Sequence, residues 1–266
     1  MLFGGAMRQM LSVLLGATAL SFASAPSAVA ADMPVKAVVA VPYLNWTGFY
    51  VGLNAGYGWG NPNSHLGEGP TPSGFGGAAP LLPADYNPGS RGFIGGAQAG
   101  YNYQINTVVV GVETDIQFGS INGTMTTGST ALPLAFATFT ESQKLSLFGT
   151  LRGRIGFLPM SNLLLYGTGG LAYGRVNVTS QFRFDTPPFN DYSGSTTQTK
   201  TGWTIGGGAE WALNPSWSVK AEYLYYDLGT VSVTGLLPKR PLFSTSLSQN
   251  VTGSIARLGV NYKFSQ

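Results

Sequence analysis

The sequence contains no cysteine, only one histidine and few charged residues. Without cysteine, the chain has no disulfides, thiolate metal sites or cysteine nucleophiles. Charged residues make up 9% of the 266 residues, whereas soluble domains carry about 25%. Repeated long apolar runs are also lacking, which excludes a bundle of membrane-spanning helices. The charges, 14 basic and 11 acidic, are scattered, so the clustered footprint of a nucleic-acid-binding protein is absent.

Glycine, aromatic and small polar residues take the place of the missing charges. The chain has 38 glycines, 12% aromatic residues and an ordinary apolar fraction of 44%. It is therefore too apolar and too aromatic for a disordered protein. A membrane β-barrel fits this composition, because only alternate residues of each strand need to be apolar.

The N-terminal residues 1–30 have the pattern of a secretory signal peptide. Arg8 supplies the positive charge, residues 10–23 form a short apolar run, and Ala28-Val29-Ala30 is an A-x-A cleavage site. We expect three parts: a signal peptide at 1–30, an extended periplasmic arm at 31–45 and a barrel at 46–266.

Eight segments alternate between apolar and polar residues, as strands with two different faces do. In the last of them, Leu258 and Val260 lie on one face, and Arg257 and Asn261 lie on the other. The segments are residues 46–59, 92–104, 107–121, 141–157, 163–179, 197–213, 216–232 and 251–264. An even number of antiparallel strands closes without a free edge, which a bilayer requires. The sequence thus predicts an all-β fold, an eight-stranded antiparallel up-and-down transmembrane β-barrel.

The connections between these segments alternate in length. Short connections at residues 105–106, 158–162 and 214–215 alternate with long ones at 60–91, 122–140, 180–196 and 233–250. Outer-membrane barrels have tight periplasmic turns and long surface loops. We therefore expect the long segments to be irregular loops at the cell surface.

Several sequence blocks resemble one known family. These blocks are NWTGFYVGLNAGYGWG (Asn45–Gly60), LLLYGTGGLAYG (Leu163–Gly174), GWTIGGGAEWAL (Gly202–Leu213), VKAEYLYYDLG (Val219–Gly229) and RLGVNYKF (Arg257–Phe264). They resemble the porin-like outer-membrane β-barrel family of alphaproteobacteria, which is related to opacity-type and OmpA-type barrels. The resemblance implies export to the outer membrane of a Gram-negative cell, with roles in envelope integrity, porin-like behaviour, host contact or haem binding. The family usually ends on an aromatic residue, but here Ser265 and Gln266 follow Phe264.

Charged residues on the polar faces form the candidate site. Their position in the alternation places them inside the barrel, because Arg or Lys facing lipid would cost about 2–4 kcal/mol at the midplane. This predicted lumen charge network comprises Glu113, Asp115, Arg152, Arg154, Glu210, Lys220, Glu222, Arg257 and Lys263. It would act either as a selectivity lining or as a matched salt-bridge network that fills the lumen. We favour the second alternative, because eight strands leave little open bore.

Aromatic residues near strand ends and on apolar faces suit the two membrane interfaces, where amphipathic rings gather. The predicted girdle comprises Trp59, Trp203, Trp211, Trp217, Tyr223, Tyr225, Tyr262 and Phe264. Trp46 is expected at a strand end or on an outer face in the same way.

The sequence favours a structural protein over an enzyme. No histidine lies on a predicted strand, so a Ser–His pair within the barrel is excluded. His65 lies in the first long connection, and one histidine without cysteine does not make a zinc site. We expect no catalytic residue, metal or cofactor.

The favoured function is an envelope-stabilising, porin-like barrel. Its partners would be outer-membrane lipid and lipopolysaccharide, with an extracellular ligand at the loops as a further candidate. We expect a monomer or a weak oligomer. Three alternatives remain: a surface protein whose loops bind haem, with His65 as axial ligand, or a host partner; a small diffusion porin; and a soluble ligand-carrier barrel with the apolar face turned inward.

Overall fold

The computed structural model describes residues 44–60, 62–68, 85–129, 137–184, 192–237 and 240–264. The expected signal peptide and nearly all of the expected arm lie outside these residues. The strands are β1 (Gly48–Gly60), β2 (Ser64–Glu68), β3 (Asp85–Tyr86), β4 (Ser90–Ile105), β5 (Val108–Ser129), β6 (Ala137–Met160), β7 (Leu163–Phe184), β8 (Tyr192–Ala212), β9 (Trp217–Leu237) and β10 (Arg240–Lys263). Within the described ranges, we find no helix that is both long enough and apolar enough to span a membrane.

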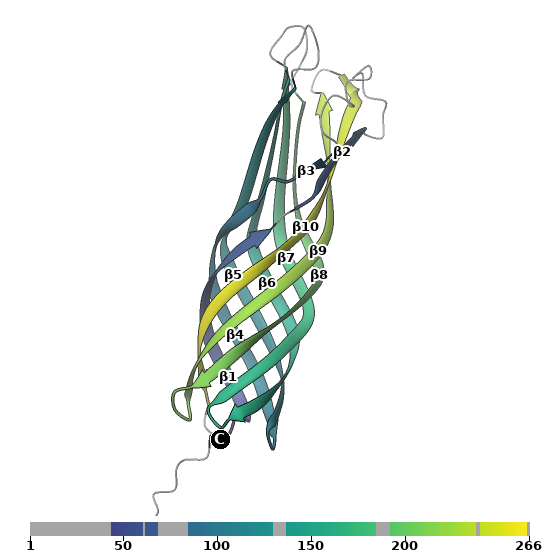
Figure 1. The fold of residues 1–266 in the computed structure, drawn as a ribbon. Helices are drawn as coiled ribbons and strands as arrows, with labels where there is room; N and C mark the ends of the chain where they lie inside the picture. Colours follow the sequence, from purple (N-terminus) through teal and green to yellow (C-terminus); the bar gives the residue numbers. More distant parts are fainter. Residues whose placement is uncertain are drawn as a thin grey trace, which may run out of the picture. The chain divides into compact units, whose positions relative to one another are not determined.

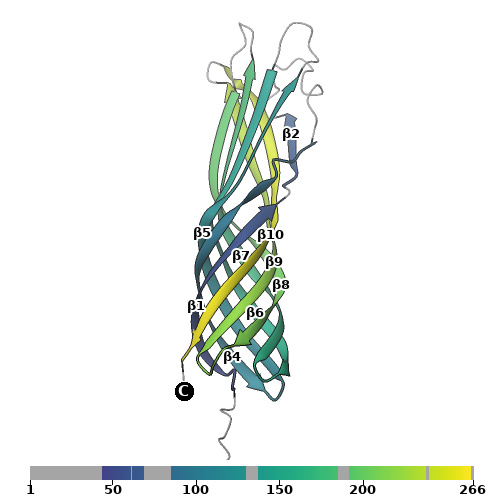
Figure 2. The same ribbon diagram turned by 60° about the vertical axis from the view of Figure 1, so that its left-hand side comes forward.

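Eight of these strands close into a barrel. From β4 to β10, each strand pairs antiparallel with the next, and β1 pairs with β4 on one side and with β10 on the other. Leu53, for example, lies opposite Ala97 of β4 and Val260 of β10. Figures 1 and 2 show the strands tilted around the barrel. The prediction of an eight-stranded antiparallel up-and-down barrel is confirmed.

The strands extend well beyond the closed ring at the end opposite the short connections, which we call the loop end. There β2 continues along β10, with Ser64 opposite Gln249, and β3 pairs with β2. Much of the segment at 122–140 is therefore strand, as are parts of those at 180–196 and 233–250. The prediction of irregular loops there was wrong. On β5 and β6, threonine and serine side chains alternate outward and pair across the strands, as Thr126 and Thr140 do at 3.2 Å, which suits a solvated ladder.

The outer surface of the closed ring is apolar. Leu258 is 70% exposed and Phe93 is 78% exposed. By contrast, Arg257, which adjoins Leu258 in the chain, is buried inside the barrel. This arrangement excludes the soluble ligand-carrier alternative, in which the apolar face would line the interior.

Two irregularities exchange the inner and outer faces of a strand. An extra residue in β6 between Leu145 and Leu147 turns Leu145 inward and leaves Lys144 exposed. The alternation of the predicted segment at 141–157, counted from Arg152 and Arg154 inside, places Leu145 outside and Lys144 inside, and both of these assignments are wrong. In β9, an extra residue at Gly229, whose φ is 73°, lets both Leu228 and Val231 face inward. A β-bulge has this effect because side chains alternate with a period of two.

The interior is consequently layered along the barrel. At the end with the short connections, the turn end, Trp46, Val109, Leu164, Tyr166 and Ala212 form a small apolar cluster. Most of the predicted lumen charges lie next to this cluster along the barrel, on its loop-end side. A larger apolar cluster fills the interior towards the loop end and comprises Ile94, Ile121, Phe139, Leu145, Phe148, Ala172, Val176, Val178, Leu224, Tyr226, Leu228, Val231, Val233, Leu247, Val251 and Ile255.

Candidate functional site in the barrel interior

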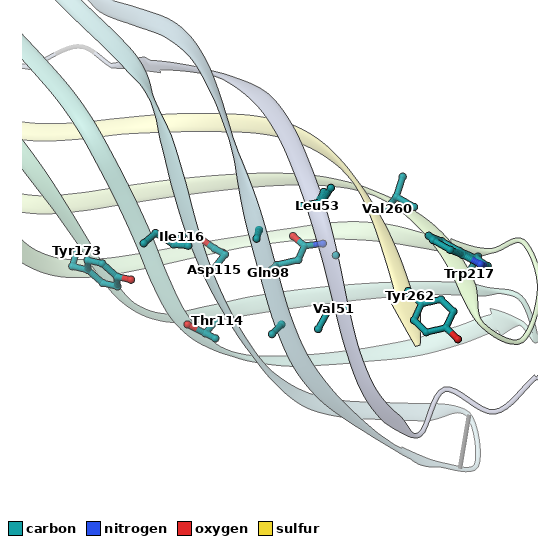
Figure 3. Close-up of a pocket in the computed structure, with 13 residues that line it drawn as sticks. Val51, Leu53, Gln98, Thr114, Asp115, Ile116, Tyr173, Trp217, Val260 and Tyr262 are labelled. Carbon is teal, nitrogen blue, oxygen red and sulfur yellow. The ribbon is translucent and has the colours of Figure 1, made fainter. Parts of the chain in front are cut away.

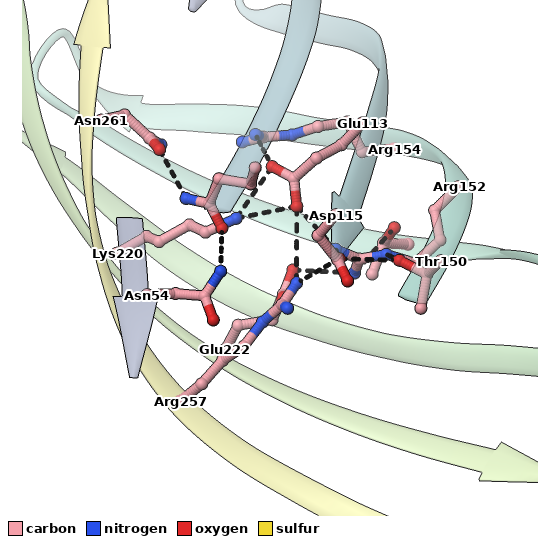
Figure 4. Close-up of polar contacts among 12 residues, drawn as sticks. Asn54, Glu113, Asp115, Thr150, Arg152, Arg154, Lys220, Glu222, Arg257 and Asn261 are labelled. Carbon is pink, nitrogen blue, oxygen red and sulfur yellow. Dashed lines mark hydrogen bonds and ion pairs between the residues drawn. The ribbon is translucent and has the colours of Figure 1, made fainter. Parts of the chain in front are cut away.

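Eight of the nine predicted lumen charges meet in one buried network, drawn in part in Figure 4. The acids are Glu113, Asp115, Glu210 and Glu222, and the bases are Arg152, Arg154, Lys220 and Arg257. The formal charges of these four acids and four bases cancel. The ladder itself sets opposite charges side by side, because Glu113, Glu210 and Glu222 lie in register with Arg152, Lys220 and Arg257 respectively.

Arg152 lies at the centre of this network, with 1% of its surface exposed. Its Nη2 atom is 2.6 Å from Glu113 Oε1 and 3.0 Å from Asp115 Oδ2, and its Nη1 atom is 3.0 Å from Glu222 Oε1. Its Nε atom donates to Thr150 Oγ1 at 2.8 Å. All three nitrogens of the guanidinium group are therefore satisfied within the protein, as a buried charge requires.

Arg257 and Lys220 tie strands β9 and β10 into the same network. Arg257 donates from Nε to Glu222 Oε2 at 2.6 Å and from Nη2 to Asp115 Oδ2 at 2.9 Å. Lys220 Nζ lies 2.8 Å from both carboxylate oxygens of Glu113. Bonds of this kind cross the interior, so they hold opposite walls of the barrel together.

Two tyrosines complete the network around Arg154. The Tyr50 hydroxyl donates to Glu113 Oε2 at 2.7 Å and accepts from Arg154 Nη1 at 3.0 Å. Arg154 also binds Glu210 at 2.7 Å, and its guanidinium lies 4.1 Å from the centre of the Tyr166 ring, an arrangement typical of a cation–π contact. Glycine at position 208 leaves room for Tyr166, since a Cβ there would approach the Tyr166 hydroxyl to 2.7 Å.

Amide side chains extend the polar layer across β1, β4 and β10. Asn54 donates to Gln98 at 3.0 Å, Gln98 donates to Asn261 at 2.5 Å, and Asn261 donates to Glu210 at 2.8 Å. Neither these amides nor the two tyrosines were among the predicted site residues. Tyr50 and Asn54 do share the inward parity of β1, so strict alternation through Tyr50 could have identified them.

Trp46 closes the interior at the turn end. The sequence placed it at a strand end or on the outer surface, but it is buried. Its backbone N–H donates to Gln104 Oε1 at 2.8 Å, and its indole N–H donates to the carbonyl of Ser161 at 3.0 Å. Residues 44–46, just before β1, therefore lie against the interior at the turn end. Of the two predicted places, Trp46 takes the strand end and not the outer face.

Lys263 is the predicted lumen residue that lies apart from the network. It ends β10 at the turn end, where its Nζ atom donates to the carbonyl of Asn45. Its contact therefore ties the segment before β1 to the end of the last strand.

The predicted girdle residues face outward near the two rims of the apolar surface. Trp203, Trp211, Trp217, Tyr223, Tyr262, Phe264 and Trp59 are exposed, and Tyr225 is partly exposed. Trp217 and Tyr262 meet at the turn end with ring centres 5.1 Å apart, and Trp203 meets Tyr225 nearer the loop end at 5.5 Å.

A shallow apolar depression lies on this outer wall (Figure 3). Outward-facing side chains line it, among them those of Leu53, Ala97, Ala99, Ile116 and Trp217. Because these side chains point away from the barrel axis, the depression belongs to the outer surface and not to a lumen.

Known proteins with similar sequences are outer-membrane proteins. The family model described as outer membrane protein beta-barrel domain matches residues 15–264. The 31 kDa outer-membrane immunogenic protein of Brucella melitensis is 39% identical over 264 residues, which cover 96% of this chain and 100% of that protein. The 22 kDa outer membrane protein of Rhizobium leguminosarum is 28% identical over 235 residues, covering 88% of this chain and 83% of that protein.

Among solved structures, the outer membrane protein OprG from Pseudomonas aeruginosa is 14% identical, with a TM-score of 0.43; the match covers 84% of this chain and 98% of that chain. The family match and the Brucella relative each span nearly the whole sequence. The chain therefore belongs to the outer membrane protein beta-barrel family, with relatives in alphaproteobacteria, and is an outer-membrane protein of a Gram-negative cell.

Proposed function

We propose that this protein is a closed structural barrel, which stabilises the outer membrane and holds its loop-end extension at the cell surface. It carries out no catalysis and conducts no solute. The observation that carries this proposal is the sequence of layers in the interior. A charge-balanced network lies between an apolar cluster at the turn end and a larger apolar cluster towards the loop end.

The energetics of the network support a closed barrel. Removing one partner from a buried ion pair costs about 3–5 kcal/mol, because the other charge is left without compensation. Opening a water-filled path would require Arg152, Arg257 and their acids to separate and the apolar layers to move aside. A balanced set of charges also gives no preference for ions of one sign. These features argue against the small diffusion porin that the sequence left open.

The outer surface supports a lipid environment and a lipopolysaccharide partner. Between the aromatic residues the wall is apolar, as acyl chains require. At the loop-end side of the ring, exposed Arg91 and Lys144 lie in one cross-strand row that begins at Trp59 and runs through Asn122. Basic groups at this level suit the phosphates of lipopolysaccharide. Replacing both by glutamine should reduce the lipopolysaccharide that copurifies with the protein, whereas Lys200→Gln on β8 serves as the control.

Recording in planar lipid bilayers tests the closed barrel. The purified, heat-modifiable protein should produce no unitary conductance steps, while a diffusion porin prepared in the same way provides the positive control. Reproducible steps from the wild-type protein would refute the proposal. The envelope role has a separate test. Cells lacking the protein should become sensitive to detergent. Wild-type protein should restore resistance, and an Arg91→Gln/Lys144→Gln variant should restore less of it.

A surface-binding role remains the second candidate, because the Brucella relative is named an immunogenic outer-membrane protein. The middle parts of the connections that would carry such binding, residues 69–84, 130–136, 185–191 and 238–239, lie outside the described residues. Exposed His65 on β2 is the haem ligand that this alternative requires. A His65→Ala variant that binds haem as tightly as the wild type would remove that alternative.

A further inference from the structure

Glu141 is a buried acid that takes no part in the lumen charge network. It lies on the inward face of β6 in the loop-end extension, beyond the aromatic residues, and is 0% exposed. Its Oε1 atom accepts hydrogen bonds from Ser64 Oγ of β2 at 2.7 Å and from Gln249 Nε2 of β10 at 2.6 Å. Glu141 thus connects three elements of the extension.

Three oxygen atoms around this contact have no hydrogen-bond partner among the described residues. They are Glu141 Oε2, Gln143 Oε1 and Gln249 Oε1. Gln143 is two residues from Glu141 on the same inward face of β6, and the Gln249 amide contacts Glu141 directly. Buried acceptors of this kind are normally satisfied by a protein group, a water or an ion.

Among the described residues, the side chains around Glu141 provide no compensating charge. Phe139 precedes it on the inward face of β6, and Leu247 and Val251 flank Gln249 on β10, all three within the larger apolar cluster. In the part of the chain that the structure describes, no lysine or arginine forms an ion pair with Glu141. An ionised carboxylate in such a place is costly unless a cation accompanies it. The lumen charge network nearer the turn end, in contrast, is fully balanced.

We propose that Glu141, Gln143 and Gln249 form a binding site for a hard cation. A carboxylate and two amide carbonyl oxygens are the ligands that such ions prefer. Sodium and calcium share this chemistry and are both present outside the cell. The ion would link β6 to β10 and, through Ser64, to β2. Its binding would therefore stabilise the loop-end extension, with a dissociation constant of about 10⁻⁴–10⁻³ M in the range of extracellular calcium modules.

The test uses the full mature protein in detergent at pH 7.5, after treatment with a chelator. Thermal unfolding is followed by heat-modifiable migration in choline chloride alone, with 150 mM NaCl, or with CaCl₂ up to about 10 mM. We expect a saturable rise in Tm with sodium or with calcium, and the two series show which ion the site takes. Isothermal titration should give one site per chain.

Variants separate this site from general salt effects. Glu141→Gln should abolish the rise in Tm, and Gln143→Met should weaken binding at least about tenfold. The control is Asp227→Asn, which removes a carboxylate from the same half of the barrel while its side-chain oxygen still accepts from the Gly229 N–H. This variant should bind as the wild type does.

Three results would overturn the proposal. One is a wild-type protein whose Tm responds to neither cation. Another is an equal response in folded Glu141→Gln protein. The third is a Tm that changes with pH in the wild type and not in Glu141→Gln, and that responds to neither cation. This result would identify a proton as the occupant. If Glu141→Gln does not fold, the titration of Gln143→Met decides the question, since unchanged affinity would exclude the site.

Discussion

Arg152 and Glu113 lie directly opposite each other on β6 and β5, with Arg152 Nη2 2.6 Å from Glu113 Oε1 in a water-excluded interior. Replacing Arg152 by methionine keeps the volume but leaves Glu113, Asp115 and Glu222 with one positive charge fewer. We expect a loss of about 3–5 kcal/mol in unfolding free energy, measured by urea unfolding in detergent or lipid.

The exposed Arg91→Met variant is the control, and it should lose under about 1 kcal/mol. Adding Glu113→Gln to Arg152→Met restores charge balance and should recover part of the loss. If Arg152→Met were as stable as Arg91→Met, the network would contribute nothing to stability.

The bulge in β9 depends on Gly229, which has a φ of 73°. A Cβ at this position would contact nothing within 4 Å, so a substitution acts through the backbone alone. Gly229→Ala should cost about 1–2 kcal/mol because alanine disfavours this conformation, whereas Gly229→Asn should cost less. The unfolding free energies of the two variants give the comparison. Equal losses would show that the bulge relaxes to another conformation.

Alternation along the sequence predicted the closed ring because lipid on one side and a filled interior on the other impose a strict period of two. It placed Arg257 inside and Leu258 outside, as the structure does. It failed at Leu145 and Lys144, because one additional residue in β6 after Leu145 reverses the assignments on its N-terminal side. Among 38 glycines, nothing in the sequence marks Gly229 as the bulge.

The extension could not be predicted from the same pattern. Beyond the bulges, the inward positions of β6 and β9 are a mixture of apolar residues, such as Phe139 and Val233, and polar ones, such as Glu141, so the polar-inside rule no longer holds. The outward face of the extension is rich in threonine and serine, a composition that favours a loop prediction. Contacts across the barrel, such as Glu141 with Ser64, join residues far apart in sequence and leave no local signal.

Thiol labelling tests the two faces of β10, because the chain has no native cysteine. A nitroxide on Leu258→Cys should be relaxed by lipid-dissolved oxygen and not by a water-soluble reagent. Ile255→Cys, whose position is 0% exposed, should not react with maleimide until the protein unfolds. Relaxation of the Leu258→Cys label by the aqueous reagent would contradict the outward assignment.

Trp46 should be more important for stability than any exposed tryptophan at the turn end. Trp46→Ala leaves a cavity beside Leu164 and should cost about 3–5 kcal/mol. Trp46→Phe loses mainly the hydrogen bond to Ser161, at about 1 kcal/mol. Trp217→Ala, at an exposed position of the same end, is the control for the unfolding measurement. Should Trp46→Ala behave like Trp217→Ala, the segment before β1 would not close the barrel.

Glu141 should make stability depend on pH. Burial raises its pKa above the ordinary value of 4.5, and the hydrogen bonds from Ser64 and Gln249 only partly oppose this shift. The groups that face it from β2, β6 and β10 are Ser64, Gln143 and Gln249, none of which ionises. The folded protein then binds the proton more tightly than the unfolded chain does. The stabilisation is fully present below pH 4.5 and is lost as the pH rises through the raised pKa.

The measurement is the unfolding free energy from pH 4 to pH 8, made in choline chloride with a chelator so that no hard cation competes with the proton. The unfolding free energy of the wild type minus that of Glu141→Gln should decline as the pH rises above 4.5 and then level off. A wild-type profile parallel to that of Glu141→Gln would mean that Glu141 titrates alike in the folded and unfolded protein, and burial would then have no effect on its proton.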